Sequence, residues 1–558
     1  MKKLSLFLVI VLTAVMLGGC GGNSGSTTAT ASGAATASAA SGKKILNICR
    51  QVELSDMDSS IATESESLTA IVCVIEPLYV TNPEDKPVPG IAESYEVSKD
   101  GKTYTFHLRK NANWTNGEPV TANDFVFSWR RLADPKTASE YSYMVDSAAI
   151  KNSSAVIAGQ MPTDKLGVYA KDDKTLVVEL DRPIPYFISL VSFPIFCPIN
   201  QKFCEEKGDK YAVGIENLLC CGPFVMSSWD VGGNTYSFTK NPKYYDPDKV
   251  KVDQVNIQVI KDNQQAVLSY ENGDTDFTPI AGDLITKYQN NPGFKSVESC
   301  FLWYISANIN PKSDKFRTGL QNLNLRKAIA LSYDKDAICK DILKDGSIPA
   351  NFAIPRKLAF GPDGKDFRDT SESYLTADKQ KAKEYWEKAK KELGTDTVNI
   401  EFLYDDSEAT PLIAQFIQNE VETNLPGVKI TLKAQPKKSR LDLMRNREFE
   451  LGFTRWGPDY SDPMTFLDMW ETGSSYNYGE WSSPEYDSLL KQATTGDLAN
   501  DPAKRWEALK RAESLVMNDA VILPVYQKGM SFLLRPGLTG IPLYTVNVCN
   551  YAFAVYDK

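Results

Sequence analysis

The sequence predicts a mixed α/β protein of two or three lobes, preceded by an export signal and a linker. Two observations support this fold class. From Lys43 onward, strand-like alternation and helical periodicity follow each other with turn signals between them, which is typical of α/β lobes and not of a sandwich or a helix bundle. The chain has 558 residues, which is too many for a single hydrophobic core.

The N-terminal segment has the pattern of an export signal, because two lysines precede an apolar run from Leu4 to Leu17. The run is too short to span a bilayer comfortably, which takes about 20 apolar residues. Leu17-Gly18-Gly19-Cys20 is similar to the bacterial lipobox, in which the cysteine receives a diacylglycerol and becomes the first residue after cleavage. We expect a lipoprotein signal peptide over residues 1–19 and lipidation of Cys20; the alternative is an ordinary signal with a chance cysteine.

A flexible linker is expected over residues 20–42, since almost every residue after Cys20 is Gly, Ser, Thr or Ala. A chain of about twenty such residues has a root-mean-square length of a few tens of Å. A folded body held to a membrane by Cys20 would therefore be able to rotate and meet a partner in the same membrane.

Residues 103–109 alternate apolar and polar side chains, which predicts a half-buried strand with His107 on its polar face. His107 is the only histidine of the chain. A Ser-His-Asp or Cys-His pair would have to use this surface position, the sequence has no GxSxG motif, and HExxH is impossible with one histidine. We expect no enzyme; hydrolysis by a carboxylate pair has no motif in its favour.

The segment after this strand predicts a turn and then a helix. Residues 114–119 contain Asn116-Gly117, a strong turn signal. Thr121 is expected to cap a helix that continues through Leu132, with Asp124 in the capping-box position.

The clearest succession of elements lies in the third quarter of the chain. Its periodicity predicts a strand-helix-strand unit with parallel strands and crossover helices. The expected elements are, in order, a helix over 378–393, a strand over 398–404, a helix over 411–423, a strand over 428–433, a helix over 439–445 and a strand that includes 449–453 and ends at Arg455.

Charge and cysteine content exclude further classes. The net charge is −9 with a pI near 5.1, whereas nucleic-acid binding needs a basic stripe. Ten cysteines leave nine if Cys20 is lipidated, so at least one thiol has no partner within the chain. Cys220 and Cys221 are adjacent and no CxxC occurs, which supports neither a zinc site nor a thioredoxin-like motif. Disulfides are permitted outside the cytoplasm, but the spacing assigns no pairs.

Seven stretches together suggest a family. The most specific runs over residues 90–125 and includes Asn113-Trp114-Thr115-Asn116-Gly117-Glu118-Pro119. Six shorter ones follow in order: 128–135, 221–224, 241–245, 325–329, 456–463 and 483–487. They resemble, over about residues 45–558, solute-binding protein family 5 and its OppA-like oligopeptide-binding members. Most of these motifs, including the Trp114 turn and the Gly222-Pro223 corner, are better explained by folding than by ligand contact.

The resemblance implies a periplasmic-binding-protein-like type II fold of cluster C, with two α/β lobes, a hinge and an additional inserted small domain. Lobe I would comprise residues 43–76, 213–305 and 525–558. The inserted domain would comprise 77–212 and lobe II 306–524. The implied function is that of the substrate-binding component of an ABC transporter, which captures oligopeptides in the cleft between the lobes and delivers them to the membrane permease.

The resemblance also implies a ligand site. Asp459 matches the family's aspartate that pairs with the peptide α-amino group, and a buried ammonium needs such a partner. Trp456 would wall the pocket, and backbone groups of Trp456 and Gly457 would pair with the peptide main chain as with an added strand. Tyr141 and Asn477 are also carried over as ligand-binding residues. The alternative is that Asp459 only caps the next turn.

Two positions depart from the family pattern. The best-known members hold the peptide carboxylate with an arginine and a histidine, and these places correspond to Phe453 and Thr410 here. The carboxylate grip is therefore in doubt, and we expect the ligand length or its C-terminal chemistry to differ. Asp462, which precedes Pro463, is expected to be a structural cap.

The expected partners are an oligopeptide ligand, the permease subunits of an ABC importer, and the membrane through the lipid on Cys20. We expect a monomer on the extracytoplasmic face of a cell membrane, at a Gram-positive surface, with no nucleic acid, cofactor or metal. The alternatives are the same fold binding a dipeptide, a nickel chelate, haem or an oligosaccharide, and a receptor for a peptide signal. The single histidine disfavours nickel.

Overall fold

The computed structural model describes residues 43–84, 86–406, 409–494, 496–499, 501–541, 543 and 549–556. The predicted signal peptide, Cys20 and the linker lie outside the described residues, so these expectations remain predictions. In the described part of the chain, no helix combines the length and the apolar character that crossing a membrane requires.

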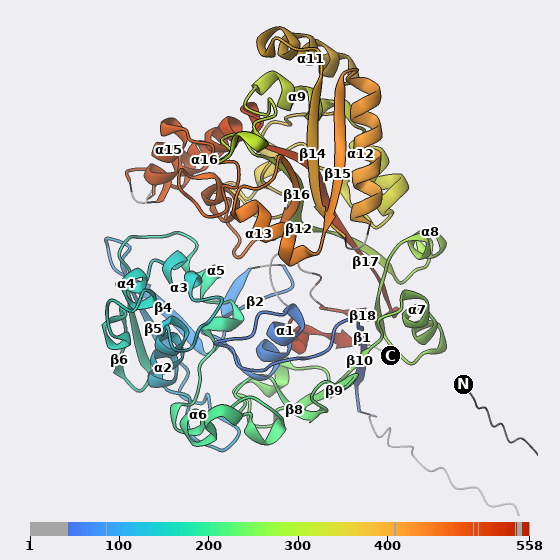
Figure 1. The fold of residues 1–558 in the computed structure, drawn as a ribbon. Coiled ribbons are helices and arrows are strands. Elements are labelled where there is room, and N and C mark those ends of the chain that lie inside the picture. Colours follow the sequence, from blue (N-terminus) through green and yellow to red (C-terminus); the bar gives the residue numbers. More distant parts are fainter. Residues whose placement is uncertain are drawn as a thin grey trace, which may run out of the picture. The chain divides into compact units, whose positions relative to one another are not determined.

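A mixed sheet of eleven strands forms the centre of the fold (Figure 1). Its strand order is β15-β14-β16-β12-β17-β11-β1-β10-β9-β8, and β13 pairs with β17 off this path. The strands are β1 (Ile45–Arg50), β8 (Phe224–Trp229), β9 (Thr235–Lys240), β10 (Gln254–Val259), β11 (Phe277–Ile280), β12 (Phe294–Ala307), β13 (Ile348–Pro349), β14 (Val398–Asp405), β15 (Val428–Gln435), β16 (Leu451–Trp456) and β17 (Ile522–Leu534).

Two long strands join the halves of this sheet. β12 and β17 are antiparallel partners; β12 also pairs with β16, and β17 also pairs with β11. Their register shifts between Glu298 and Leu302. The predicted lobe boundaries near residues 305 and 525 fall within these two strands, and the division into lobes remains a prediction.

The third quarter confirms the predicted alternation of helices and strands. β14 is parallel to both β15 and β16, with Val398 opposite Val428 and Phe402 opposite Leu451. The strand expected from residue 449 to Arg455 begins two residues later and ends one residue later, at Trp456. The reason is its antiparallel pairing with β12, where Trp456 lies opposite Leu302, a contact that local periodicity does not encode.

A separate antiparallel sheet has the order β4-β5-β7-β6. Its strands are β4 (Ala92–Val97), β5 (Thr103–Leu108), β6 (Val168–Asp172) and β7 (Thr175–Glu179), and a hairpin of β2 (Tyr79–Thr81) and β3 (Pro87–Pro89) precedes it. Every second residue of β5 is buried, and the side chain of His107 is 39% exposed with Nε2 3.5 Å from Glu96 Oε1. The predicted position of His107 on the polar face is confirmed.

The Trp114 turn and the helix after it are also as predicted. The Trp114 N–H donates to the Glu118 carbonyl at 2.8 Å, and the indole N–H donates to Asp124 Oδ2 at 3.3 Å. The helix α2 begins at Ala122, and the Thr121 N–H donates to Asp124 Oδ2 at 2.7 Å, as in a capping box. Since Trp114 is buried, its role is structural.

The helices cover the sheets. The α-helices of at least four residues in the described ranges are α1 (Ser65–Val74), α2 (Ala122–Ala133), α3 (Tyr143–Ser147), α4 (Ser153–Ile157), α5 (Phe187–Leu190), α6 (Gln201–Lys207), α7 (Asn263–Asn272), α8 (Asp283–Tyr288), α9 (Leu323–Ser332), α11 (Lys379–Leu393), α12 (Thr410–Asn424), α13 (Lys437–Arg445), α14 (Met464–Leu467), α15 (Pro484–Thr494) and α16 (Pro502–Asn518). One buried cluster packs α9, α11 and α12 against β12 and β14 to β17.

Nine cysteines lie in the described ranges, where they form no disulfide with one another, and eight of them are buried. The sequence left the pairing open. Burial raises the pKa of the Cys220 thiol to about 12, which makes its thiolate rare at neutral pH.

Candidate functional site

The candidate site lies where β16 leaves the sheet. β14 ends at Asp405 and β16 at Trp456, and because the two strands are parallel, their carboxyl ends meet at the same sheet edge. Ligands of open α/β sheets bind outside this edge. Gly457, Pro458 and Asp459 follow directly, so the predicted ligand residues stand at the position that the fold offers for binding.

Asp459 is partly buried and is fixed by its backbone, whose N–H donates to Thr465 Oγ1 at 2.9 Å. Its carboxylate accepts a hydrogen bond from the Tyr143 hydroxyl. Among the described residues, no lysine, arginine or histidine forms an ion pair with it. Burial raises the pKa of Asp459 to about 7, because the charged form loses water without gaining a cation.

Three tyrosines surround this carboxylate. Tyr141 and Tyr143 come from the start of α3, with ring centroids 6.1 Å apart, and Tyr476 comes from the loop before α15. Burial raises the pKa of Tyr141 to about 12, and the negative charge of Asp459 adds to the shift. Burial and Asp459 also raise the pKa of Tyr476. The surroundings of Asp459 are therefore aromatic, with the buried Asp468 as a second carboxyl group nearby.

Trp456 contacts one of these tyrosines, and its role as a wall of the ligand pocket remains a prediction. Its indole N–H donates to the Thr465 carbonyl at 2.9 Å, and its ring packs edge-on against Tyr476 at 4.7 Å. Thr465 thus holds both Trp456 and Asp459. Gly457 allows a close approach, since a Cβ there would lie 2.3 Å from Cε1 of Phe301, whose side chain is 44% exposed.

Asn477 has a different environment. It is 4% exposed, its Nδ2 donates to the Trp481 carbonyl at 2.8 Å, and its Oδ1 accepts from the Trp481 N–H at 3.1 Å. Its amide therefore closes the loop that carries Tyr476. The structure brings Asp459, Trp456, Gly457 and Tyr141 together, and direct ligand contact by these residues and by Asn477 remains a prediction.

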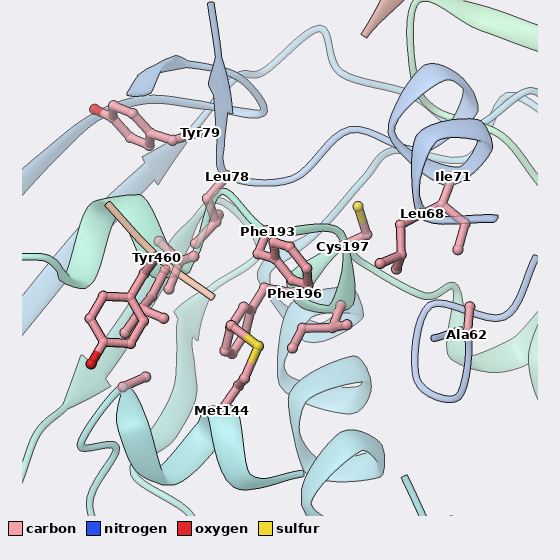
Figure 2. Packing of buried hydrophobic residues seen from close by; sticks show 14 of the residues in the cluster. Ala62, Leu68, Ile71, Leu78, Tyr79, Met144, Phe193, Phe196, Cys197 and Tyr460 are labelled. Atoms are coloured by element: carbon pink, nitrogen blue, oxygen red, sulfur yellow. The ribbon is translucent and has the colours of Figure 1, made fainter. Parts of the chain in front are cut away.

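The segment after Asp459 is fixed by contacts with distant parts of the chain. Tyr460 stacks on Tyr186 with centroids 4.5 Å apart, and Figure 2 shows Tyr460 in the same packed cluster as Leu78 and Phe193. Asp462 accepts the Met464 N–H at 3.0 Å, which confirms its predicted role as a cap. It also binds Arg505 through two hydrogen bonds of 2.8 Å.

Sequence reasoning missed Tyr143, Tyr476 and Thr465. Tyr143 lies two residues after Tyr141 but more than 300 residues before Asp459, so no local pattern links them. The available signal was the aromatic content of the stretch that includes Tyr141 and Tyr143.

The two positions that depart from the family pattern carry no charge. Phe453 is 2% exposed and packs with Phe402 and Tyr526 at 6.2 and 6.5 Å. Thr410 is buried at the start of α12. Neither side chain is placed to bind a carboxylate ion.

Comparison with known proteins agrees with this geometry. Residues 86–478 match the model of bacterial extracellular solute-binding proteins, family 5. The chain is 33% identical over 568 residues to the dipeptide-binding protein of Lactococcus lactis subsp. cremoris, covering 100% of this chain and 99% of that one. It is 32% identical to the oligopeptide-binding protein OppA of Bacillus subtilis, covering 97% of each.

A solved structure of the Bacillus anthracis oligopeptide ABC transporter substrate-binding domain is 40% identical, with a TM-score of 0.76, over 93% of this chain and 99% of that one. The structure of Listeria monocytogenes OppA bound to peptide is 35% identical, with a TM-score of 0.75, over 93% and 100%. The mixed α/β fold and these matches lead to one conclusion: this chain belongs to family 5 of the bacterial extracellular solute-binding proteins.

Proposed function

We propose that this protein is the substrate-binding component of an ABC importer, which captures oligopeptides outside the cytoplasm and delivers them to the membrane permease. The observation that supports this most is Asp459, a carboxylate among tyrosines with no cation paired to it among the described residues. The names of the relatives, which include dipeptide- and oligopeptide-binding proteins, agree with a peptide ligand.

In this proposal the peptide ammonium supplies the missing positive charge. It would pair with Asp459 and lie against the rings of Tyr141, Tyr143 and Tyr476, where cation–π attraction adds to the ion pair. Backbone groups of Trp456 and Gly457 would continue the pairing of β16 onto the peptide main chain, which gives affinity independent of peptide sequence.

Peptide binding would favour closure of the lobes, because the residues around Asp459 come from two stretches that lie far apart in the sequence. In the predicted division, Tyr141 and Tyr143 belong to the inserted domain, and Asp459 belongs to lobe II. A ligand that contacts both stretches binds the closed form better than the open one, and only such differential binding shifts the equilibrium. The permease would then recognise the closed form.

The proposal extends to the cell surface. The lipid on Cys20 and the linker over residues 20–42 would anchor a monomer to the extracytoplasmic face of the membrane, at a Gram-positive surface. The protein would bind its ligand without converting it, in agreement with relatives that are named as binding proteins.

Thermal unfolding with a panel of ligands tests the proposed ligand class. The test protein carries Cys20→Ala, which removes the lipid. A mixture of pentapeptides at about 100 times Kd should stabilise it by about 2.7 kcal/mol. An oligosaccharide, haem and a nickel chelate should leave the melting temperature unchanged. A shift with one of these and none with peptides would refute a peptide ligand.

A further inference from the structure

The last described segment of the chain, residues 549–556, lies against α1 and β1, which come from the start of the folded part. Asn550 Nδ2 donates to the Val72 carbonyl at 3.4 Å, across 478 positions of the sequence. The Tyr551 hydroxyl accepts from Arg50 Nη2 at 2.6 Å and from Arg50 Nε at 3.1 Å. Polar contacts that span almost the whole folded chain therefore hold this C-terminal segment to the first helix and the first strand.

Two cysteines meet in this contact. Cys73 on α1 is 0% exposed, and Cys549 is partly buried. The Cys73 thiol donates to the Cys549 carbonyl at 3.9 Å, and its sulfur accepts a hydrogen bond from the Tyr551 N–H. The sulfur of Cys73 thus lies over the stretch of backbone that runs from Cys549 to Tyr551.

The separation of the two residues suits a disulfide bond. A carbonyl oxygen lies at most about 2.8 Å from the Cα of its own residue, so Cys73 Sγ lies within about 6.7 Å of the Cys549 Cα. A disulfide requires Cα atoms about 4.4–6.8 Å apart. Since Cys549 is partly exposed, rotation of its side chain and a small shift of the C-terminal segment suffice to bring the two sulfurs together.

The two thiols differ in their surroundings. Burial raises the pKa of both thiols, that of Cys549 to about 11. The positive charge of Arg50 beside Cys549 opposes this shift. The thiolate is the form that exchanges with disulfides, and a neighbouring arginine favours it. Cys549 is therefore the thiol that reacts first, because it is the more exposed of the two and has a cation beside it.

We propose that Cys73 and Cys549 are a redox pair, which closes into a disulfide outside the cytoplasm and fastens the C-terminal segment to α1. The family to which the chain belongs is one of extracellular proteins, and such surroundings permit disulfides. The bond would close a loop from residue 73 to residue 549. A disulfide that closes a longer loop restricts the unfolded chain more strongly, so the oxidised form would be the more stable one. This inference does not depend on the nature of the ligand.

The closing reaction is thiol–disulfide exchange with a small-molecule or protein disulfide as the oxidant. With glutathione disulfide, the Cys549 thiolate attacks one sulfur, forms a mixed disulfide and releases the first glutathione. The Cys73 thiolate then attacks Cys549 Sγ and releases the second glutathione. The two thiols of the protein lose two electrons and two protons, which the two released glutathione molecules take up.

Peptide mapping of the Cys20→Ala protein tests the pairing. Trypsin leaves Cys73 in the peptide 51–99 and Cys549 in the peptide 529–558, because Lys86 and Arg535 each precede a proline. Neither peptide contains another cysteine. After incubation with an excess of glutathione disulfide and alkylation of the remaining thiols, at least about half of the molecules should yield these two peptides as one cross-linked species. The thiols titrated in the denatured protein should fall from nine towards seven.

Thermal unfolding tests the effect of the bond. The oxidised protein should melt at least about 2 °C above the reduced protein. Cys549→Ser should remove this difference and the cross-linked species. Cys339→Ser is the matched control, because Cys339 is a buried cysteine of the separate cluster around α9, α11 and α12; it should keep both. The map of the wild type decides the pairing even if Cys549→Ser does not fold.

The remaining outcomes each overturn the inference. Nine reactive thiols after oxidation show that the two cysteines do not form a disulfide. A cross-link of the peptide 51–99 to any peptide other than 529–558 assigns Cys73 a different partner. Equal melting temperatures of the fully oxidised and the reduced protein show that the bond does not fasten the segment.

Discussion

Asp459 is partly buried, and no described cationic side chain neutralises its charge. The affinity for a cationic ligand should therefore depend on whether Asp459 is protonated. Its raised pKa of about 7 means that the ligand-free carboxylate is about half ionised at neutral pH. A peptide ammonium pairs with the ionised form, so proton binding and peptide binding compete.

The pH dependence of affinity follows from this competition. Between pH 7.5 and pH 5.5 the carboxylate becomes protonated while the peptide amine stays charged, so affinity should fall by roughly 10- to 30-fold. Calorimetry across this range checks the expectation. The Asp459→Asn variant should bind weakly and without this slope.

A matched control separates Asp459 from its acidic neighbour. Burial raises the pKa of Asp468 to about 8, and Asp468 also accepts a hydrogen bond from Tyr460, at 3.4 Å. Asp468 is therefore mostly neutral over the same range, and Asp468→Asn should keep the pH slope. A slope that vanished in this variant instead would assign the titration to Asp468.

At the scale of elements, the segment from Asp459 to α14 is held by a buried ion pair to α16. The side chains of Arg505 and Asp462 are 6% and 9% exposed and form two hydrogen bonds. Removing one partner of such a pair leaves an uncompensated buried charge, which costs about 3–5 kcal/mol.

Arg505→Met should therefore lower the free energy of unfolding by about 3–5 kcal/mol, as measured by urea denaturation. Adding Asp462→Asn should recover a large part of this loss, because the amide needs no cation. Full stability of the single variant would show that water reaches Asp462.

The bounds of some helices and strands were predicted well from the sequence. The helix over 378–393 and the strand over 398–404 were predicted to within one residue at each end, because each has a strong hydrophobic period of its own. Asp378 also caps the helix. The end of β16 was predicted at Arg455, one residue early, since the last residue, Trp456, is added by pairing with β12.

At the scale of the whole molecule, the site depends on contacts between distant segments. The motif around Asp459 predicted the acidic group and Trp456 from a continuous stretch of sequence. The contact of Tyr143 with Asp459 forms only when α3 packs near the sheet. The contacts of Asp405 with two arginines form only when the strands of the sheet are assembled. A family pattern predicts the residues at positions that match the family's motif. It does not predict which other residues of this chain contact them.

Titration of the Cys20→Ala protein with a free-amine pentapeptide and its N-acetylated twin, on wild type and Asp459→Asn, tests the central claim most directly. The free-amine peptide should bind at micromolar Kd or better, about −8 kcal/mol. Acetylation and Asp459→Asn should each remove roughly 2–5 kcal/mol, and together little more than either alone. Equal binding of both peptides by the wild type would contradict recognition of the peptide amine by Asp459.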